Sequence, residues 1–143
     1  MILISHRGNI NGRNPEKENH PDYIQAALAA GYDVEIDVWY VNGWWLGHDA
    51  PTYPCPEHLL RKCWCHTKNA EALRQASNLR LPMYFWHDDD DYTITSHGYI
   101  WSHSHSPTLE KAIVVLPEVR NQSEQYRCAG VCSDYIERYK PRL

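Results

Sequence analysis

Two acidic residues two positions apart are the clearest sign of chemistry in this chain of 143 residues. Glu35 and Asp37 lie in the segment Asp33–Tyr40, in which apolar and acidic residues alternate. Residues two apart in a strand project from the same face, so both carboxylates leave it on one side. Such a pair favours a bound cation, and its oxygen atoms suit Mg²⁺, Ca²⁺ or Mn²⁺. The spacing predicts a metal site, and the alternative is the solvated face of an edge strand.

Two histidines at expected strand ends add acid–base chemistry. His6 follows the apolar run Ile2–Ser5, and His48 follows Trp44–Gly47. Imidazoles titrate near neutral pH, so one can accept a proton from a nucleophile while another donates a proton to a leaving group. Either histidine alone could be structural, but the pair favours catalysis. Arg7 offers a fork of donors that matches phosphate oxygens, or a surface salt bridge.

Short apolar runs that end in polar residues would position these groups. Helices are expected from Pro21 to Leu28, stopped by Gly31, and over Asn69–Ser77. The expected strands are Ile2–Ser5, Asp33–Tyr40, Trp44–Gly47, Cys63–Thr67, Met83–Trp86, Thr93–Ser96, Tyr99–Trp101, Ile113–Leu116 and Gly130–Cys132. Glu118, Ser133 and Asp134 follow the last two strands and could join the rim of a pocket.

The repeated order of strand and then polar residue is typical of a β/α barrel, whose active site gathers at the carboxyl ends of its strands. A full barrel needs about 250 residues. We therefore expect one domain over residues 1–143, an α/β fold forming a compact, incomplete TIM-like β/α barrel with shortened or missing helices. The competing fold is an open mixed α/β sheet, in which hairpins at Asn42-Gly43 and His97-Gly98 are equally natural.

Composition narrows the classes of protein. The formal net charge of −4, with scattered Lys and Arg, argues against a nucleic-acid partner. No run approaches the roughly 20 apolar residues that span a bilayer. Met1–Ser5 is too short for a signal peptide, and five cysteines form no disulfide framework, so we expect a cytoplasmic protein. Six Trp, ten Tyr and nine His suit a cleft for a polar ligand.

Four ordered motifs resemble the signature of the glycerophosphodiester phosphodiesterases, within the PI-PLC-like phosphodiesterase superfamily. The resemblance covers roughly the first third of the chain. The motifs are His6-Arg7-Gly8, Glu18-Asn19, Glu35-Ile36-Asp37-Val38 and His48-Asp49. The resemblance implies a metal-dependent hydrolase that cleaves a small glycerophosphodiester, with a neighbouring hydroxyl as nucleophile and a cyclic phosphate as intermediate. A lysophospholipid or sphingomyelin head group, as in related phospholipase-D-like toxins, is the second choice of substrate.

The resemblance also implies roles for residues. His6 and His48 would exchange protons, Glu35 and Asp37 would hold one divalent ion, Mg²⁺ or Ca²⁺, and Arg7 would bind the phosphate. Lys68, two residues after His66, is similar to the lysine of an acid-x-Lys pair in this family and would stabilise the developing phosphoryl charge. Glu18 and Asn19 would serve the substrate or the outer shell of the metal.

His66 departs from the family, in which a third metal carboxylate is expected at this position. An imidazole would shift the preference toward Mn²⁺ or Zn²⁺, if His66 is a ligand at all. Trp86, His87 and Trp101 end later strands and are candidates for binding the substrate. Asp88–Asp91 is expected to be an exposed turn.

Two other functions remain open. A catalytically idle barrel would bind a phosphorylated ligand or a protein partner through the same pocket. A zinc-binding interaction module would be built from Cys63, Cys65 and His66 with His103 and His105, although strand alternation sends both thiols to the face opposite His66.

Overall fold

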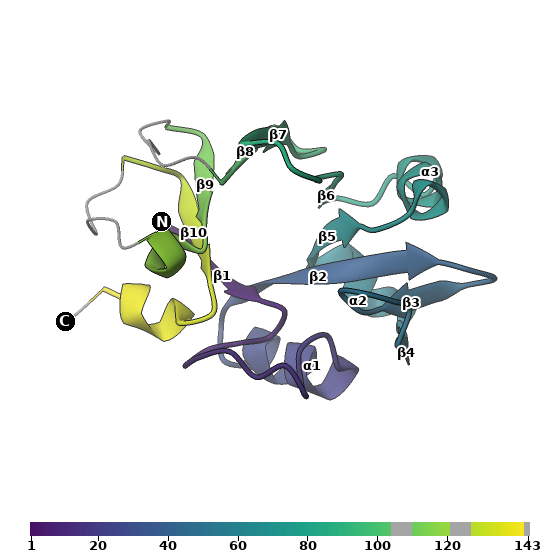
Figure 1. The fold of residues 1–143 in the computed structure, drawn as a ribbon, viewed down its shortest axis with the longest axis horizontal. Coiled ribbons are helices and arrows are strands. Elements are labelled where there is room, and N and C mark those ends of the chain that lie inside the picture. Colours follow the sequence, from purple (N-terminus) through teal and green to yellow (C-terminus); the bar gives the residue numbers. More distant parts are fainter. Residues whose placement is uncertain (104–109, 121–126, 142–143) are drawn as a thin grey trace.

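A curled, mixed sheet of ten strands forms the centre of the fold (Figure 1). The computed structural model describes residues 1–103, 110–120 and 127–141. Seven strands are parallel, in the spatial order β6-β5-β2-β1-β10-β9-β8, while β7 is antiparallel to β8 and the β3–β4 hairpin extends antiparallel from the second half of β2. The strands are β1 (Ile2–His6), β2 (Asp33–Tyr40), β3 (Trp44–Leu46), β4 (Tyr53–Pro54), β5 (Trp64–Thr67), β6 (Tyr84–Phe85), β7 (Tyr92–Ile94), β8 (Ile100–Ser102), β9 (Ala112–Val115) and β10 (Gly130–Ser133).

The expected incomplete TIM-like β/α barrel is wrong for this chain. Such a barrel alternates strand and helix and closes by strand pairing. Within the described residues there are three α-helices, α1 (Pro21–Ala29), α2 (Glu57–Lys62) and α3 (Ala70–Asn78), and β9 and β10 are followed by the 3-10 helices η1 (Pro117–Arg120) and η2 (Ile136–Tyr139). The sheet is instead a curled half-barrel of parallel strands with antiparallel additions, β7 beside β8 and the β3–β4 hairpin beside β2. Polar residues follow its parallel strands as they would in a barrel, so the pattern did not distinguish the two folds.

Side-chain caps and turns explain where the two longer helices begin and end. The ring nitrogen Nδ1 of His20 accepts a hydrogen bond from the backbone N–H of Asp22, and Pro21 occupies the first turn of α1. Gly31, with φ of +95°, reverses the chain after α1. Asn69 caps α3 by accepting from the N–H of Ala72. Both expected helices are confirmed.

The two faces of the sheet are packed differently. Helices α1, α2 and α3 cover the outer face of β2 and β5, where Val34, Ile36, Val38, Leu59, Leu60 and Cys65 are buried. Side chains from six parallel strands fill the inside of the curl, namely Ile4, Trp64, Phe85, Trp101, Ile113, Val115 and Cys132. On β6 and β9 this apolar filling reaches the last residue of the strand, Phe85 and Val115, whereas on β1 and β5 it stops earlier. The polar residues that follow along β1, β2 and β5 therefore face the space above it.

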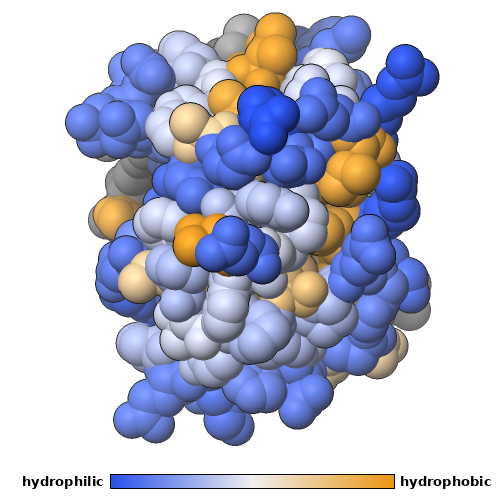
Figure 2. All heavy atoms as spheres, turned by 90° about the vertical axis from the view of Figure 1, so that its right-hand side faces the viewer, coloured by the Kyte–Doolittle hydropathy of each residue, from blue (hydrophilic) through white to orange (hydrophobic). Residues whose placement is uncertain are grey.

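The surface offers no broad apolar face in the view of Figure 2, which looks at the side carrying α3 and the tip of the β2–β3 hairpin. Hydrophilic residues cover most of this side, and hydrophobic residues form small separate patches. No helix in the described part of the chain is long and apolar enough to cross a membrane.

Candidate metal and acid–base centre

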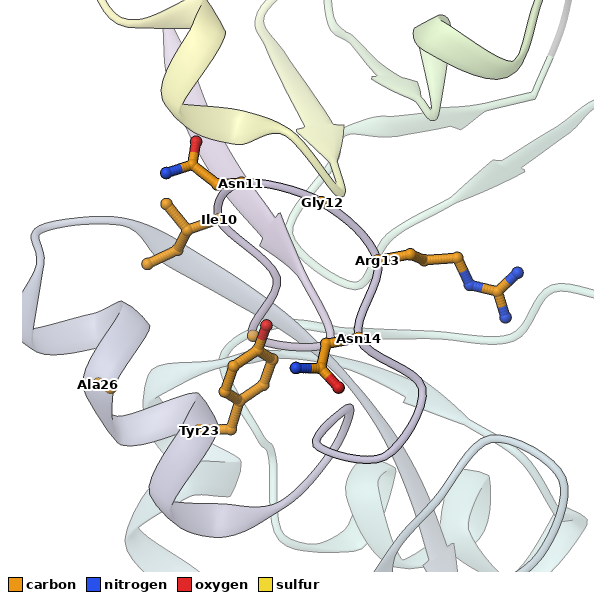
Figure 3. Close-up of a pocket in the computed structure, with 8 residues that line it drawn as sticks. Ile10, Asn11, Gly12, Arg13, Asn14, Tyr23 and Ala26 are labelled. Atoms are coloured by element: carbon orange, nitrogen blue, oxygen red, sulfur yellow. The ribbon is translucent and has the colours of Figure 1, made fainter.

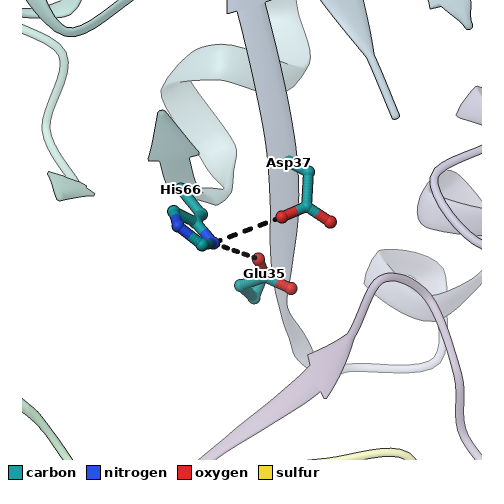
Figure 4. A group of neighbouring side chains, drawn as sticks. All are labelled: Glu35, Asp37 and His66. Atoms are coloured by element: carbon teal, nitrogen blue, oxygen red, sulfur yellow. Dashed lines mark ion pairs between the residues drawn. The ribbon is translucent and has the colours of Figure 1, made fainter. Parts of the chain in front are cut away.

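Glu35 and Asp37 lie on the inner face of β2, which pairs with β1 on one edge and β5 on the other. Their exposed fractions are 2% and 0%. The solvated edge strand that the sequence left open is therefore wrong. The register of β5 sets His66 beside Asp37, and Figure 4 shows the three side chains converging from the two strands.

The three side chains have the geometry of a ligand set. Nδ1 of His66 lies 3.2 Å from Oδ1 of Asp37 and 3.8 Å from Oε1 of Glu35. One ligand atom from each residue lies within 4.8 Å of the others. Oε2 of Glu35 and Oδ1 of Asp37 are buried and have no hydrogen-bond partner among the described residues. Buried carboxylate oxygens without donors are costly, so the residues fit a divalent cation.

The other oxygen of Asp37 is held by the loop after β1. Nδ2 of Asn19 donates to Oδ2 over 2.9 Å, and Oδ1 of Asn19 accepts from the N–H of Asp37 over 3.0 Å. Nε of Arg7 forms an ion pair with Oδ2 at 3.0 Å, and Nη1 of Arg7 donates to Glu18 over 3.1 Å. Arg7 and Asn19 adopt positive φ angles of 58° and 65° to make these contacts. Asn19 thus holds the carboxylate of Asp37 in place, and Glu18 holds the guanidinium of Arg7.

Burial and neighbouring charges shift the pKa values of Glu35 and Asp37 in opposite directions. Burial, followed by the charge of Asp37, raises the pKa of Glu35 well above its ordinary value. For Asp37 burial acts upward as well, but the contacts with His66, Arg7 and Asn19 outweigh it and lower the pKa. Burial alone would lower the pKa of Arg7, yet the surrounding carboxylates raise it. Of the two neighbouring carboxyl groups, Asp37 is therefore the stronger acid.

His6 is oriented by an aspartate from the other end of the chain. Its Nδ1 lies 2.7 Å from Oδ1 of Asp134, which also accepts from Nδ2 of Asn9 over 2.9 Å. A carboxylate accepts only, so Nδ1 carries the proton and Nε2 is left as a base, 3.8 Å from Oε2 of Glu35. Burial would raise the pKa of Asp134, but the hydrogen bond and charge of His6 dominate and lower it. This is a histidine–aspartate pair of the kind used in general-base catalysis.

The sequence indicated Asp134 only as a candidate for the rim of a pocket, not as a partner of His6. Its only sequence signal is its position after an expected strand, Gly130–Cys132, and Ser133 and Glu118 likewise follow expected strands. In the structure Ser133 donates to Glu118, and Glu118 accepts from the N–H of Asp134. The parallel pairing of β10 with β1 brings Asp134 to His6, and nothing local in the sequence reports that pairing.

A cavity of about 420 Å³ joins the metal-ligand cluster to most of the residues expected from the sequence. It is lined by His6, Arg7, Glu35, His48, His66, Lys68, His87, Asp88, Trp101, His103, Val115 and Leu116. The side chain of His48 is 45% exposed, and its Nδ1 lies 2.7 Å from Oδ1 of Asp49. Trp86 does not line this cavity and is 41% exposed. The cavity therefore gathers both proposed acid–base histidines, the cationic side chains of Arg7 and Lys68, and two of the three candidate ligands, Glu35 and His66, while Asp37 is fully buried beside them.

Two neighbouring cavities differ in chemistry. One of about 230 Å³ shares Arg7 and His48 with the first and continues past Glu18 and Asn19. Another, of about 400 Å³, lies between α1 and the loop after β1 (Figure 3). Its side chains are those of Ile10, Asn11, Arg13, Asn14, Tyr23 and Ala26, with Arg13 extending away from Tyr23. It holds no carboxylate or imidazole, so the acid–base chemistry belongs to the first cavity.

The cysteines do not join a metal site with His66. Cys63 and Cys65 are buried in the outer core against the helices, on the side of β5 opposite His66. Burial raises the pKa of Cys63 to about 12, whereas a zinc ligand is a thiolate. His103 lines the large cavity, and Ser104 and His105 lie outside the described residues. The described part of the proposed zinc module therefore does not assemble.

Comparisons of the chain with protein families, with curated proteins and with solved structures found no match. The resemblance to the glycerophosphodiester phosphodiesterases stays a prediction.

Proposed function

We propose that this protein is a divalent-metal phosphodiesterase that cleaves a small phosphodiester, in the first instance a glycerophosphodiester. The observation that carries the proposal is one cavity lined by His6, Glu35 and His66. Asp134 pairs with His6 there, and Asp37 completes the ligand cluster with Glu35 and His66. A protein that only binds phosphate needs positively charged side chains, but it does not need a base that is held in a fixed orientation.

Each residue has a role that follows from its contacts. Nε2 of His6, whose tautomer Asp134 sets, accepts or returns the proton of the attacking hydroxyl. His48, which lines the same cavity, serves the leaving oxygen, and the two histidines exchange these tasks in a second step that opens a cyclic phosphate. Arg7 and Lys68 neutralise the charge that develops on the phosphoryl oxygens.

Glu35, Asp37 and His66 would hold the metal ion. When bound, that ion would polarise a phosphoryl oxygen as a Lewis acid. The five cysteines are unpaired, which suits the reducing cytoplasm in which we place the reaction.

The test is hydrolysis of glycerophosphocholine, a glycerophosphodiester with a hydroxyl next to the phosphodiester, by the purified chain with Mg²⁺, Ca²⁺, Mn²⁺ or Zn²⁺. The expected result is a chelator-sensitive activity that His6→Ala abolishes. Asp134→Asn should lower kcat by roughly 10²–10⁴-fold, because His6 loses the carboxylate that sets its tautomer.

Asp22→Asn, at an exposed site on α1, is the matched control and should leave kcat unchanged. Inertness with all four metals would reject the enzyme. Binding of inorganic phosphate by that inert protein would then favour the idle, ligand-binding alternative.

A further inference from the structure

The two ring nitrogens of His66 have different partners. Nε2 lies 3.0 Å from the backbone carbonyl oxygen of His87, which can only accept, so Nε2 is the donor. In the neutral ring Nδ1 then carries a lone pair, and this atom faces the oxygens of Asp37 and Glu35 at 3.2 and 3.8 Å. The β6–β7 loop thus fixes the tautomer, as an outer-shell carbonyl does for a metal-ligating histidine.

Three electron-pair donors therefore point into one space (Figure 4). Oδ1 of Asp37 is buried and has no hydrogen-bond partner among the residues that the structure describes, and Oε1 is the Glu35 oxygen that faces Nδ1 of His66. The second oxygen of Asp37 is already occupied by Asn19 and Arg7. A metal cation in this space would give all three atoms a partner at once.

The charge around the cluster bears on which metal fits. Arg7, in its ion pair with Asp37, offsets part of the negative charge of the two carboxylates. A hard ion such as Mg²⁺ or Ca²⁺ depends on that charge, whereas a neutral imidazole favours the softer first-row ions.

We infer that the centre is a mixed nitrogen–oxygen site, with Nδ1 of His66 as a ligand beside Glu35 and Asp37, and that it selects Zn²⁺ and Mn²⁺ over Mg²⁺ and Ca²⁺. The inference rests on the metal centre of the proposed function and is independent of whether a diester is cleaved.

Calorimetric titration of the metal-stripped full chain with the four ions tests the selection. Zn²⁺ and Mn²⁺ should bind on the order of tenfold or more tighter than Mg²⁺ and Ca²⁺. His66→Asp makes an all-oxygen site and should weaken Zn²⁺ on the order of tenfold while strengthening Mg²⁺. His58→Asp, at an exposed position on α2, adds the same charge away from the site and should change neither affinity.

Pulsed electron paramagnetic resonance of the Mn²⁺-loaded chain identifies the ligand directly. The spectrum should show hyperfine coupling to one histidine nitrogen, changed by ¹⁵N-histidine labelling, lost in His66→Asp and kept in His58→Asp. The wild-type spectrum needs no variant, and His66→Gln serves if His66→Asp does not fold. Absence of the coupling, its persistence in both His66 variants, or equal affinity for Mg²⁺ and Mn²⁺ would overturn the inference.

The two proposals fail separately. A protein that is inert toward diesters but shows the nitrogen coupling keeps this inference and loses the phosphodiesterase. An active enzyme that binds Mg²⁺ as tightly as Mn²⁺ keeps the phosphodiesterase and loses this inference.

Discussion

Glu35 is a buried carboxyl group, and its neighbours do not fully compensate the negative charge of its ionised form. It is 2% exposed, and burial together with Asp37 raises its pKa well above the ordinary 4.5. The folded chain therefore holds this proton more firmly than the unfolded chain does. The resulting stabilisation is fully present below pH 4.5 and is lost as the pH rises through the raised pKa.

Glu35→Gln should accordingly stabilise the metal-free protein at neutral pH, because the amide needs no proton to be buried. The gain in the free energy of unfolding over wild type should grow as the pH rises above 4.5 and vanish below it. Thermal melts over pH 4 to 8 measure it, with roughly 3–6 °C of Tm for each kcal/mol.

Glu57→Gln, at an exposed position on α2, is the control and should show no such trend. A variant gain that is flat across this pH range would contradict the raised pKa of Glu35.

At the scale of the secondary-structure elements, Asn69 links strand β2 to helix α3. Its Oδ1 accepts from the N–H of Ala72 to begin α3 and from the N–H of Tyr40 at the end of β2, while its Nδ2 donates to the carbonyl oxygen of Tyr40. One side chain thus sets where the helix starts relative to the strand that carries Glu35 and Asp37.

Asn69→Ala should lower the free energy of unfolding by about 2–3 kcal/mol, about 1 from the cap and the rest from the two strand contacts. Asn69→Asp keeps both acceptor bonds and loses only the donor, so it should cost less. Urea denaturation measures both, with the exposed Ser77→Ala as control. Equal losses for Ala and Asp would show that the two acceptor bonds, the cap included, contribute nothing.

Helices and strands with strong local sequence patterns could be predicted, and those without such patterns could not. The alternation of Asp33–Tyr40 gave β2 with its bounds, and Pro21 and Asn69 marked the starts of α1 and α3. Helix α2 was not predicted, since its six residues have no side-chain cap, and β4 has only two residues. The site residues that lie on predicted elements were found, whereas Asp134 depends on a pairing between the two ends of the chain.

At the scale of the whole molecule, a backbone hydrogen bond and ring packing connect β6 to the β7–β8 end of the sheet. The N–H of Ser96 donates to the carbonyl oxygen of Tyr84, and the rings of Phe85 on β6 and Trp101 on β8 lie 4.5 Å apart. The sequence showed apolar runs but not how many strands would close around them, so the barrel prediction failed here. The curvature of the sheet therefore depends on the volume of the aromatic side chains packed inside it.

Phe85→Ala should lower the free energy of unfolding by about 3–5 kcal/mol, a large part of the roughly 5–15 that stabilises a domain. It should also weaken metal binding, because Phe85 stacks on His66 with ring centroids 5.1 Å apart. Leu59→Ala in the outer core should cost about 2–5 kcal/mol. It should leave metal affinity unchanged, because Leu59 packs under the helices on the far side of the sheet. Urea denaturation and calorimetry with Mn²⁺ on both variants separate the two effects, and equal loss of metal affinity in both would refute the role given to the inner aromatic layer.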